Sequence, residues 1–163
     1  MKMESLKKLY VHELKDLYSA ETQILDALPN LIDVAQDEGL KDALGSHHEE
    51  TRRQVSRLER IFEGKDFSPR GHRCKGMEGL IEEGRDLVNE DIGQDVLDAS
   101  IIAAAQRVEH YEIASYGSAR AHARKLGEHE DVELLTKSLE EESAADRKLT
   151  ELAERRINVA ATV

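Results

Sequence analysis

Acidic side chains fall inside the apolar stripes of several segments of this chain, at positions where a helix would turn them toward a protein core. Glu109 and Glu112 are three residues apart, so one helix face carries both. Burying a carboxylate without a partner is very costly, so each acid needs a cation, a hydrogen-bond donor or a metal ion. The candidate metal ligands are Glu21, His47, Glu50, Glu109, Glu112, Glu142 and Asp146.

These residue types form a donor set suited to a pair of metal ions. Carboxylates bridge two cations roughly 3.5–4 Å apart, and oxygen ligands combined with imidazole suit iron or manganese. In helical bundles such centres take a Glu from each of two helices and a Glu-x-x-His from each of the other two. The pattern predicts a di-metal centre of Fe or Mn, compatible with redox or peroxide-detoxifying chemistry.

The chain departs from that pattern on two segments. In the segment 40–63, His47 precedes the glutamate, and Arg53 stands where the histidine usually does. In the last long segment the position three residues after the glutamate is Ala145, so Asp146 must replace the histidine. The predicted centre is therefore poor in nitrogen, which weakens the case for iron and for oxygen chemistry.

A metal-free polar core is the alternative interpretation of the same residues. In that hypothesis the acids pair with Gln54, Gln106, Arg107 and tyrosine hydroxyls, and the protein is a non-catalytic structural or partner-binding protein. Glu49 and Glu141 are each one residue from a candidate ligand. A helical turn of roughly 100° per residue points both of them away from the predicted centre.

Leucine-rich periodicity predicts the helices that would position these residues. Apolar residues recur at three- and four-residue spacings, which indicates helices over about 3–37, 40–63, 76–89, a stretch that starts between 93 and 98 and ends at 126, and 128–158.

The connections between these helices predict the topology. Gly39 and Gly127 mark tight turns, whereas residues 64–92 form a long crossover that contains the short helix. Two helical hairpins joined by such a crossover are the arrangement of ferritin-like proteins. The sequence therefore predicts an all-α fold: a ferritin-like four-helix bundle with a short fifth helix in the crossover between the two helical hairpins, as a single domain over 1–163.

Composition narrows the environment and the partners. A formal net charge of -11 with 34 Asp+Glu residues repels nucleic acid and anionic membranes. A single Cys allows no internal disulfide and suits a reducing cytoplasm. The chain has no apolar run of membrane-spanning length, and its first residues lack the apolar stretch of a signal peptide. We expect a cytoplasmic protein with neither nucleic acid nor a membrane as partner.

The short crossover helix also suggests self-association. Met77, Leu80, Ile81 and Leu87 give it an apolar face that must be buried somewhere. Its own bundle has room for these residues, but a second copy would cover them as well. We expect a homodimer that uses helical faces near the crossover.

Five stretches resemble a known family. They are LKDLYSAETQIL (14–25), HHEET (47–51), CKGMEGLIEEG (74–84), IIAAAQRVEHYEIASYG (101–117) and LEEESAAD (139–146). On these stretches the chain resembles the YciF/YciE stress-protein family of the ferritin-like superfamily. The resemblance implies a ferritin-like bundle with a di-metal centre, often a dimer, linked to bacterial stress responses. It implies no established reaction.

Overall fold

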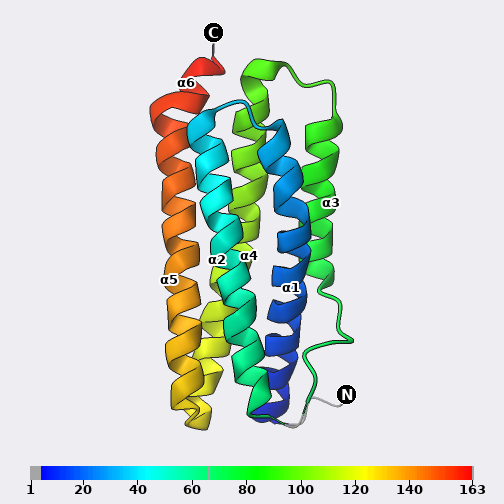
Figure 1. The fold of residues 1–163 in the computed structure, drawn as a ribbon, viewed down its shortest axis with the longest axis vertical. Helices are drawn as coiled ribbons and strands as arrows, with labels where there is room; N and C mark the ends of the chain where they lie inside the picture. The colour runs from blue at the N-terminus through cyan, green and yellow to red at the C-terminus, as the bar shows by residue number, and fades with distance from the viewer. Residues whose placement is uncertain (1–4, 66, 163) are drawn as a thin grey trace.

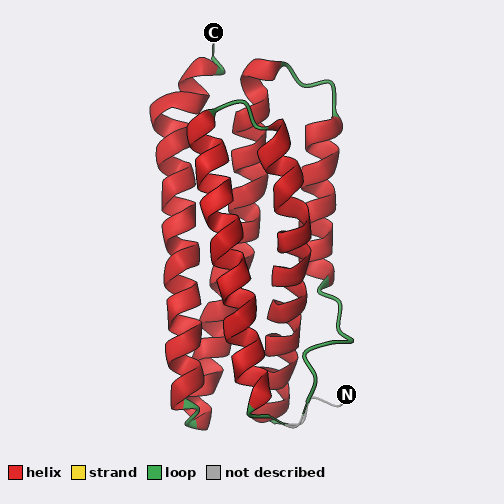
Figure 2. Ribbon diagram, in the orientation of Figure 1, coloured by secondary structure: helices red, strands yellow, loops and turns green. Residues whose placement is uncertain are grey.

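The computed structural model describes residues 5–65 and 67–162, and in these residues the chain is helical with connecting loops and no strand (Figure 2). The elements in chain order are α1 (Leu6–Val34), α2 (Glu38–Glu63), α3 (Lys75–Asn89), α4 (Gln94–Leu126), α5 (His129–Leu152), a π-helical turn (Ala153–Ile157) and α6 (Asn158–Ala160). The all-α fold predicted from the periodicity is confirmed.

The long helices form two antiparallel hairpins that pack into one bundle. The most extensive packing joins α1 to α2 and α4 to α5, and further contacts join α1 to α4 and α2 to α5. The shorter α3 lies outside these helices, against α1 and α4 (Figure 1). The chain therefore crosses from the first hairpin to the second through α3, which confirms the predicted ferritin-like topology.

The turn between α1 and α2 differs from the prediction. Gly39 was expected to end the first helix, but α1 already ends at Val34 and α2 begins at Glu38. Asp37 caps α2 by accepting a hydrogen bond from the amide of Leu40 at 2.9 Å, so Gly39 lies in the first turn of α2. The predicted start of the first helix at Met3 lies outside the described residues.

Gly127 ends α4 as the sequence predicts. Its φ of 77° is left-handed, a conformation that glycine adopts without the steric cost of a Cβ atom. The helix predicted over 128–158 is interrupted, because the chain widens into the π-helical turn after Leu152 before α6 follows.

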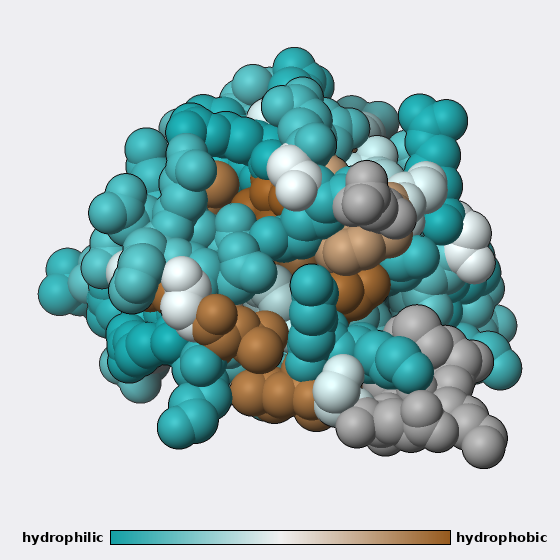
Figure 3. All heavy atoms as spheres, turned by 90° about the horizontal axis from the view of Figure 1, so that it is seen from below, coloured by the Kyte–Doolittle hydropathy of each residue, from teal (hydrophilic) through white to brown (hydrophobic). Residues whose placement is uncertain are grey.

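The bundle interior contains two apolar clusters. The upper one, at the end of the bundle where α1 turns into α2, is built around Ile24, Leu28, Leu40, Leu44, Ile101, Ala105 and Leu149. The lower one is built around Tyr10, Leu14, Leu17, Leu58, Phe62, Tyr116 and Leu135. The lower end of the molecule, viewed along the bundle, presents a largely hydrophilic surface with small apolar patches (Figure 3).

Polar residues separate these two clusters. On α2 the gap between Leu44 and Leu58 contains buried polar side chains, and on α4 the gap between Ala105 and Tyr116 contains buried acids. The candidate ligands of α2, α4 and α5 therefore lie at the middle height of the bundle.

Candidate metal centre

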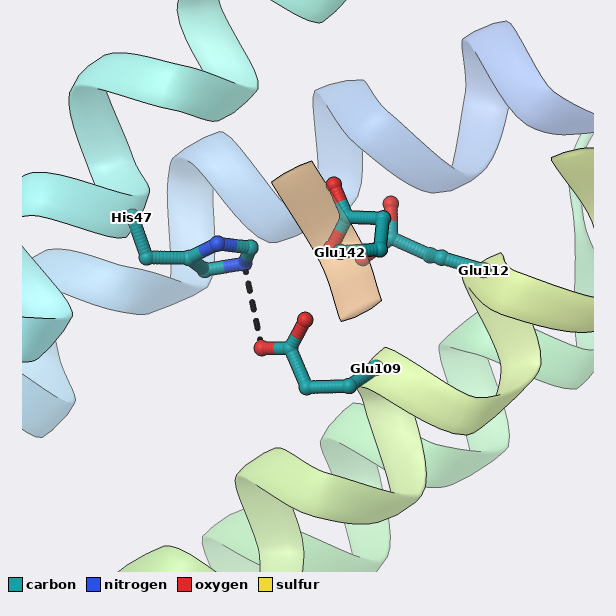
Figure 4. Close-up of side chains that lie close together, drawn as sticks. All are labelled: His47, Glu109, Glu112 and Glu142. Atoms are coloured by element: carbon teal, nitrogen blue, oxygen red, sulfur yellow. Dashed lines mark ion pairs between the residues drawn. The ribbon is translucent and has the colours of Figure 1, made fainter. Parts of the chain in front are cut away.

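Three helices bring four of the predicted ligands together. His47 from α2, Glu109 and Glu112 from α4, and Glu142 from α5 point toward one another (Figure 4). Each offers a ligand atom, and these atoms all lie within 4.8 Å of one another. All four side chains are buried, with Glu112 and Glu142 at 0% exposure. We call these residues the group of four.

The contact between His47 and Glu109 joins the two halves of the bundle. Nε2 of His47 lies 3.3 Å from Oε1 of Glu109, a contact between α2 and α4. Within the described chain neither nitrogen of His47 makes a hydrogen bond. A neutral imidazole has one protonated nitrogen and one with a free lone pair, so no hydrogen bond of the described chain occupies the lone pair that a metal ion would take.

Most carboxylate oxygens of the group also lack partners. Oε2 of Glu109, both oxygens of Glu112 and Oε2 of Glu142 are buried without a hydrogen bond among the described residues. No Lys or Arg of the described chain forms an ion pair with Glu109, Glu112 or Glu142. Buried polar groups are rarely left in this state, so the group fits a cation.

The electrostatics of the site reflect this lack of partners. Burial raises the pKa of Glu112 well above its ordinary value, and the charges of Glu142 and Glu21 raise it further. Burial also raises the pKa of Glu109, with Glu142 as the next contributor. A divalent cation reverses this preference, because its charge favours the ionised carboxylates.

Glu21 of α1 lies beside the group of four. It is fully buried, its Oε1 accepts a hydrogen bond from the hydroxyl of Tyr116, and its Oε2 has no partner in the described chain. Burial and the charge of Glu142 raise its pKa well above the ordinary value. Tyr116 follows Glu112 by four residues, and residues at that spacing lie on one face of a helix. The sequence spacing alone therefore places this tyrosine beside the acids.

Glu50 lies at the rim of the site. Its Oε2 is 4.0 Å from Nδ1 of His47, and its side chain is 29% exposed. Burial raises its pKa, and the nearby acids Glu141 and Glu142 add to this effect. Glu50 is therefore outside the group of four, and its role as a ligand stays a prediction.

Asp146 is also outside the group of four. Its Oδ1 accepts a hydrogen bond of 3.0 Å from Nε2 of Gln106 and lies 3.2 Å from Nε2 of His110. Gln106 is one of the partners that the metal-free alternative assigns to the acids. The role of Asp146 as a ligand likewise stays a prediction.

Glu141 has a partner that the helical period alone did not indicate. It forms a two-pronged ion pair with Arg57 of α2, with N–O distances of 2.6 and 2.7 Å. Gln54 donates to Glu142 and, at 3.2 Å, to Glu141, so it links the ion pair to the group of four. Glu141 is outside the group of four, but its carboxylate shares Gln54 with Glu142 and is not a free surface group.

A cavity of about 430 Å³ connects His47 and Glu109 with the surface between α2 and α5. The residues that line its outer part include Asp42, Glu50 and Lys148. Asp42 and Glu50 outnumber Lys148 beside this opening, and an excess of acidic groups attracts cations. The cavity therefore offers a route by which a hydrated metal ion reaches the group of four.

The fold and the site together define the class of protein: a ferritin-like helical bundle with a central group of one histidine and three glutamates. A family profile described as "Domain of unknown function (DUF892)" matches residues 5–162. The chain belongs to this family, and the resemblance to the YciF/YciE stress proteins is confirmed.

Two relatives show how similar the family members are. Protein YciF of Escherichia coli (strain K12) is 42% identical over 159 residues, which cover 97% of this chain and 96% of that protein. The crystal structure of the E. coli stress protein YciF superposes with a TM-score of 0.91 and covers 96% of this chain and 99% of that chain. YcfI from Rhodopseudomonas palustris superposes with a TM-score of 0.88 at 43% identity, over 91% of this chain and 95% of that chain.

None of the helices formed by the described residues combines the length and the apolar character needed to cross a lipid bilayer.

Proposed function

We propose that this chain is a di-metal carboxylate protein that binds Fe or Mn and acts in a bacterial stress response. One ion would lie within the group of four, bound by His47, Glu109 and Glu142. Glu112 and Glu21 would help to hold a second ion. Glu50 and Asp146 would complete the ligand set from the rim. Two such ions, when bound, would supply redox chemistry.

The unpartnered atoms at the centre carry this proposal. Two nitrogens of His47 and several oxygens of the buried glutamates have no hydrogen-bond partner within the described chain. A protein that buried these groups without a cation would bear a large desolvation cost. The stress-response part rests on the relative, since the E. coli protein YciF is described as a stress protein.

The metal-free polar core is the competing hypothesis, and part of its network exists. Tyr116 donates to Glu21, Gln54 donates to Glu142, and Gln106 donates to Asp146. Arg107, the one cation that this hypothesis places at the acids, is exposed instead. The network therefore surrounds the group of four and leaves its inner atoms without partners.

Neighbouring glutamates on α5 provide the test. Glu142 belongs to the group of four, whereas Glu140 is exposed on the same helix. The protein, purified without chelator, is exposed to Fe(II) or Mn(II), desalted and analysed for metal by mass spectrometry. We expect Glu142→Gln to retain much less metal after desalting than the unaltered protein, because the loss of a ligand should cost at least the roughly tenfold in affinity that outer-sphere substitutions cost.

Glu140→Gln is the matched control and should leave the bound metal unchanged. It is a better control than Glu141→Gln, because Glu141 is paired with Arg57. Equal metal content in the two variants would refute the proposal. The absence of bound metal in the unaltered protein after exposure to both ions would refute it as well.

A further inference from the structure

A second cavity, of about 460 Å³, lies on the side of the bundle that α3 covers. Its walls come from α1, α3 and α4, and most of them are aliphatic. Representative wall residues are Leu28, Leu31, Leu80, Ile81, Ala105 and Val108. The metal centre needs no such space, so the cavity requires its own explanation.

The position of α3 creates this cavity. Helix α3 stands outside the four long helices and leans on α4 at Gly84, where an added Cβ would lie 3.2 Å from the Cβ of Ala104. Protein interiors are close-packed, and their voids are few and seldom larger than a water molecule. An aliphatic space of several hundred cubic ångströms has instead the size and lining of small-molecule sites.

The two ends of the cavity differ in chemistry. The inner end reaches His47 and Glu109, both of which are buried in the middle of the bundle. The outer end is lined by the exposed side chains of Asn30, Asp33 and Arg85. Arg85 has no ion pair with any residue in the described part of the chain, so its guanidinium is available to an incoming anion.

We propose that this cavity binds an amphiphile with an aliphatic chain and a carboxylate head. The chain would occupy the space between α1, α3 and α4 with its tip toward Glu109. Arg85 would bind the carboxylate at the mouth, because a guanidinium holds a carboxylate through two parallel hydrogen bonds. A slender chain fits a cavity that extends to the bundle centre, which the outer surface of another protein could not enter.

This binding site goes beyond the proposed metal centre, because it needs no metal ion. The approach of the chain tip to bound metal rests on the proposed function, whereas the binding itself does not. Binding is therefore measured on the full chain after chelator treatment, and metal content is measured separately on untreated protein. A protein that fails to bind the amphiphile can then still be tested for metal binding, and the reverse.

The probe is decanoate, titrated into the protein by isothermal calorimetry. We expect saturable binding and a loss of at least about tenfold in affinity in Ala105→Leu, since the added side chain would fill the buried wall. Ala103→Leu is the control, because Ala103 is exposed on the same helix and does not line the cavity. Ala27→Leu, on the α1 wall, repeats the test if Ala105→Leu fails to fold.

The head group is tested with a second pair of variants. Arg85→Ala should weaken decanoate several-fold and leave decanol unaffected, because only the acid carries the charge that Arg85 binds. Arg107→Ala, an exposed arginine of α4 outside the cavity, should change neither.

Three results would overturn the inference. The first is no saturable binding of decanoate to the unaltered protein. The second is equal binding by Ala105→Leu, Ala27→Leu and Ala103→Leu. The third is unchanged decanoate binding combined with a changed molar mass in light scattering for Ala105→Leu, which would assign the cavity to an interface with a second copy.

Discussion

The acids at the centre of the bundle are where function and stability oppose each other. Glu21, Glu109 and Glu112 are almost completely buried, and burial with mutual repulsion raises the pKa of each. A sequence selected only for stability would place apolar residues there. Several buried carboxylates at one level of the core therefore cost the metal-free protein stability, as is expected of a site that is built to bind a cation.

Removing one of these acids should stabilise the metal-free protein. We expect Glu112→Gln to raise the melting temperature by about 2–4 °C at neutral pH, the change that about 1 kcal/mol produces in a domain of this size. The reason is that the amide removes a carboxylate whose pKa is raised first by burial and then by the charge of Glu142. The measurement is thermal unfolding by circular dichroism in excess chelator.

Glu151→Gln is the control for this substitution, because Glu151 is exposed on α5, and its melting temperature should stay unchanged. The metal-free polar core makes the opposite prediction for Glu112→Gln. In that case the substitution breaks a satisfied network and lowers stability by about 1–3 kcal/mol. A lower melting temperature in Glu112→Gln would therefore contradict our interpretation.

At the residue scale, the helical period predicts which way a side chain points but not which residues it contacts. It placed Glu109, Glu112 and Glu142 on inward faces, and the structure brings these residues together. It did not reveal that Glu141 binds Arg57, because this contact depends on the distance between α2 and α5. That distance is set by the packing of whole helices, which no single segment encodes.

At the scale of the elements, apolar periodicity was sufficient to find the helices, and their ends were harder to place. The turn at Gly127 follows from a local preference, since glycine readily adopts a left-handed φ. The turn at residues 35–37 depends on distant contacts. Asp98 of α4 accepts hydrogen bonds from the amides of Gln36 at 2.8 Å and Asp37 at 2.7 Å, and Arg156 pairs with Asp37.

Two glycines, one inside α2 and one directly after α4, should respond in opposite directions to replacement by alanine. Gly127→Ala should lower stability by about 1 kcal/mol, because its φ of 77° strains any residue with a Cβ. Gly45→Ala should raise it by about 0.5–1 kcal/mol, because Gly45 lies inside α2 with open space around the added methyl group. Urea unfolding of metal-free protein measures both changes.

Each of these variants is the control for the other, since both remove a glycine from the unfolded chain. A loss of stability in both would mean that the α2 position is more crowded than the structure indicates. A gain in both would mean that Gly127 does not have a left-handed backbone.

At the scale of the whole molecule, the core is divided in two. Apolar clusters fill the upper and lower parts of the bundle, and the polar layer with the group of four lies between them. The sequence indicated inward acids on separate helices but did not indicate that they share one level. That coincidence depends on how far each helix extends past its turn, which is a property of the assembled bundle.

The homodimer concerns the whole molecule and stays a prediction. Met77 is fully buried within its own bundle, whereas Leu80, Ile81 and Leu87 are half-buried and keep apolar surface that a second copy would cover. We therefore expect light scattering at micromolar concentration to give about twice the 18.3 kDa of one chain. A molar mass of one chain at every concentration would contradict this.

Metal should reverse the pH dependence of stability. Glu21, Glu109 and Glu112 have raised pKa values, mainly because they are buried. A carboxyl group with a higher pKa in the folded state stabilises that state at low pH, and this contribution is lost as the pH rises toward the raised pKa. Asp16 and Asp37 have pKa values lowered by hydrogen bonds despite their burial, so their contributions change only in more acidic solution.

The metal-free protein should therefore melt at a lower temperature at about pH 8 than at about pH 5, because the unfolded chain releases these protons near the ordinary pKa whereas the folded state keeps them to higher pH, so a rising pH favours unfolding. With saturating Mn(II) the trend should reverse. The metal binds ionised carboxylates and neutral imidazole, so its affinity and the stabilisation it gives both increase with pH. Calorimetric melting at both pH values, with chelator and with Mn(II), measures all four conditions. A melting temperature that rises with pH in chelator, or parallel trends with and without Mn(II), would show that these carboxylates do not act as a cation site.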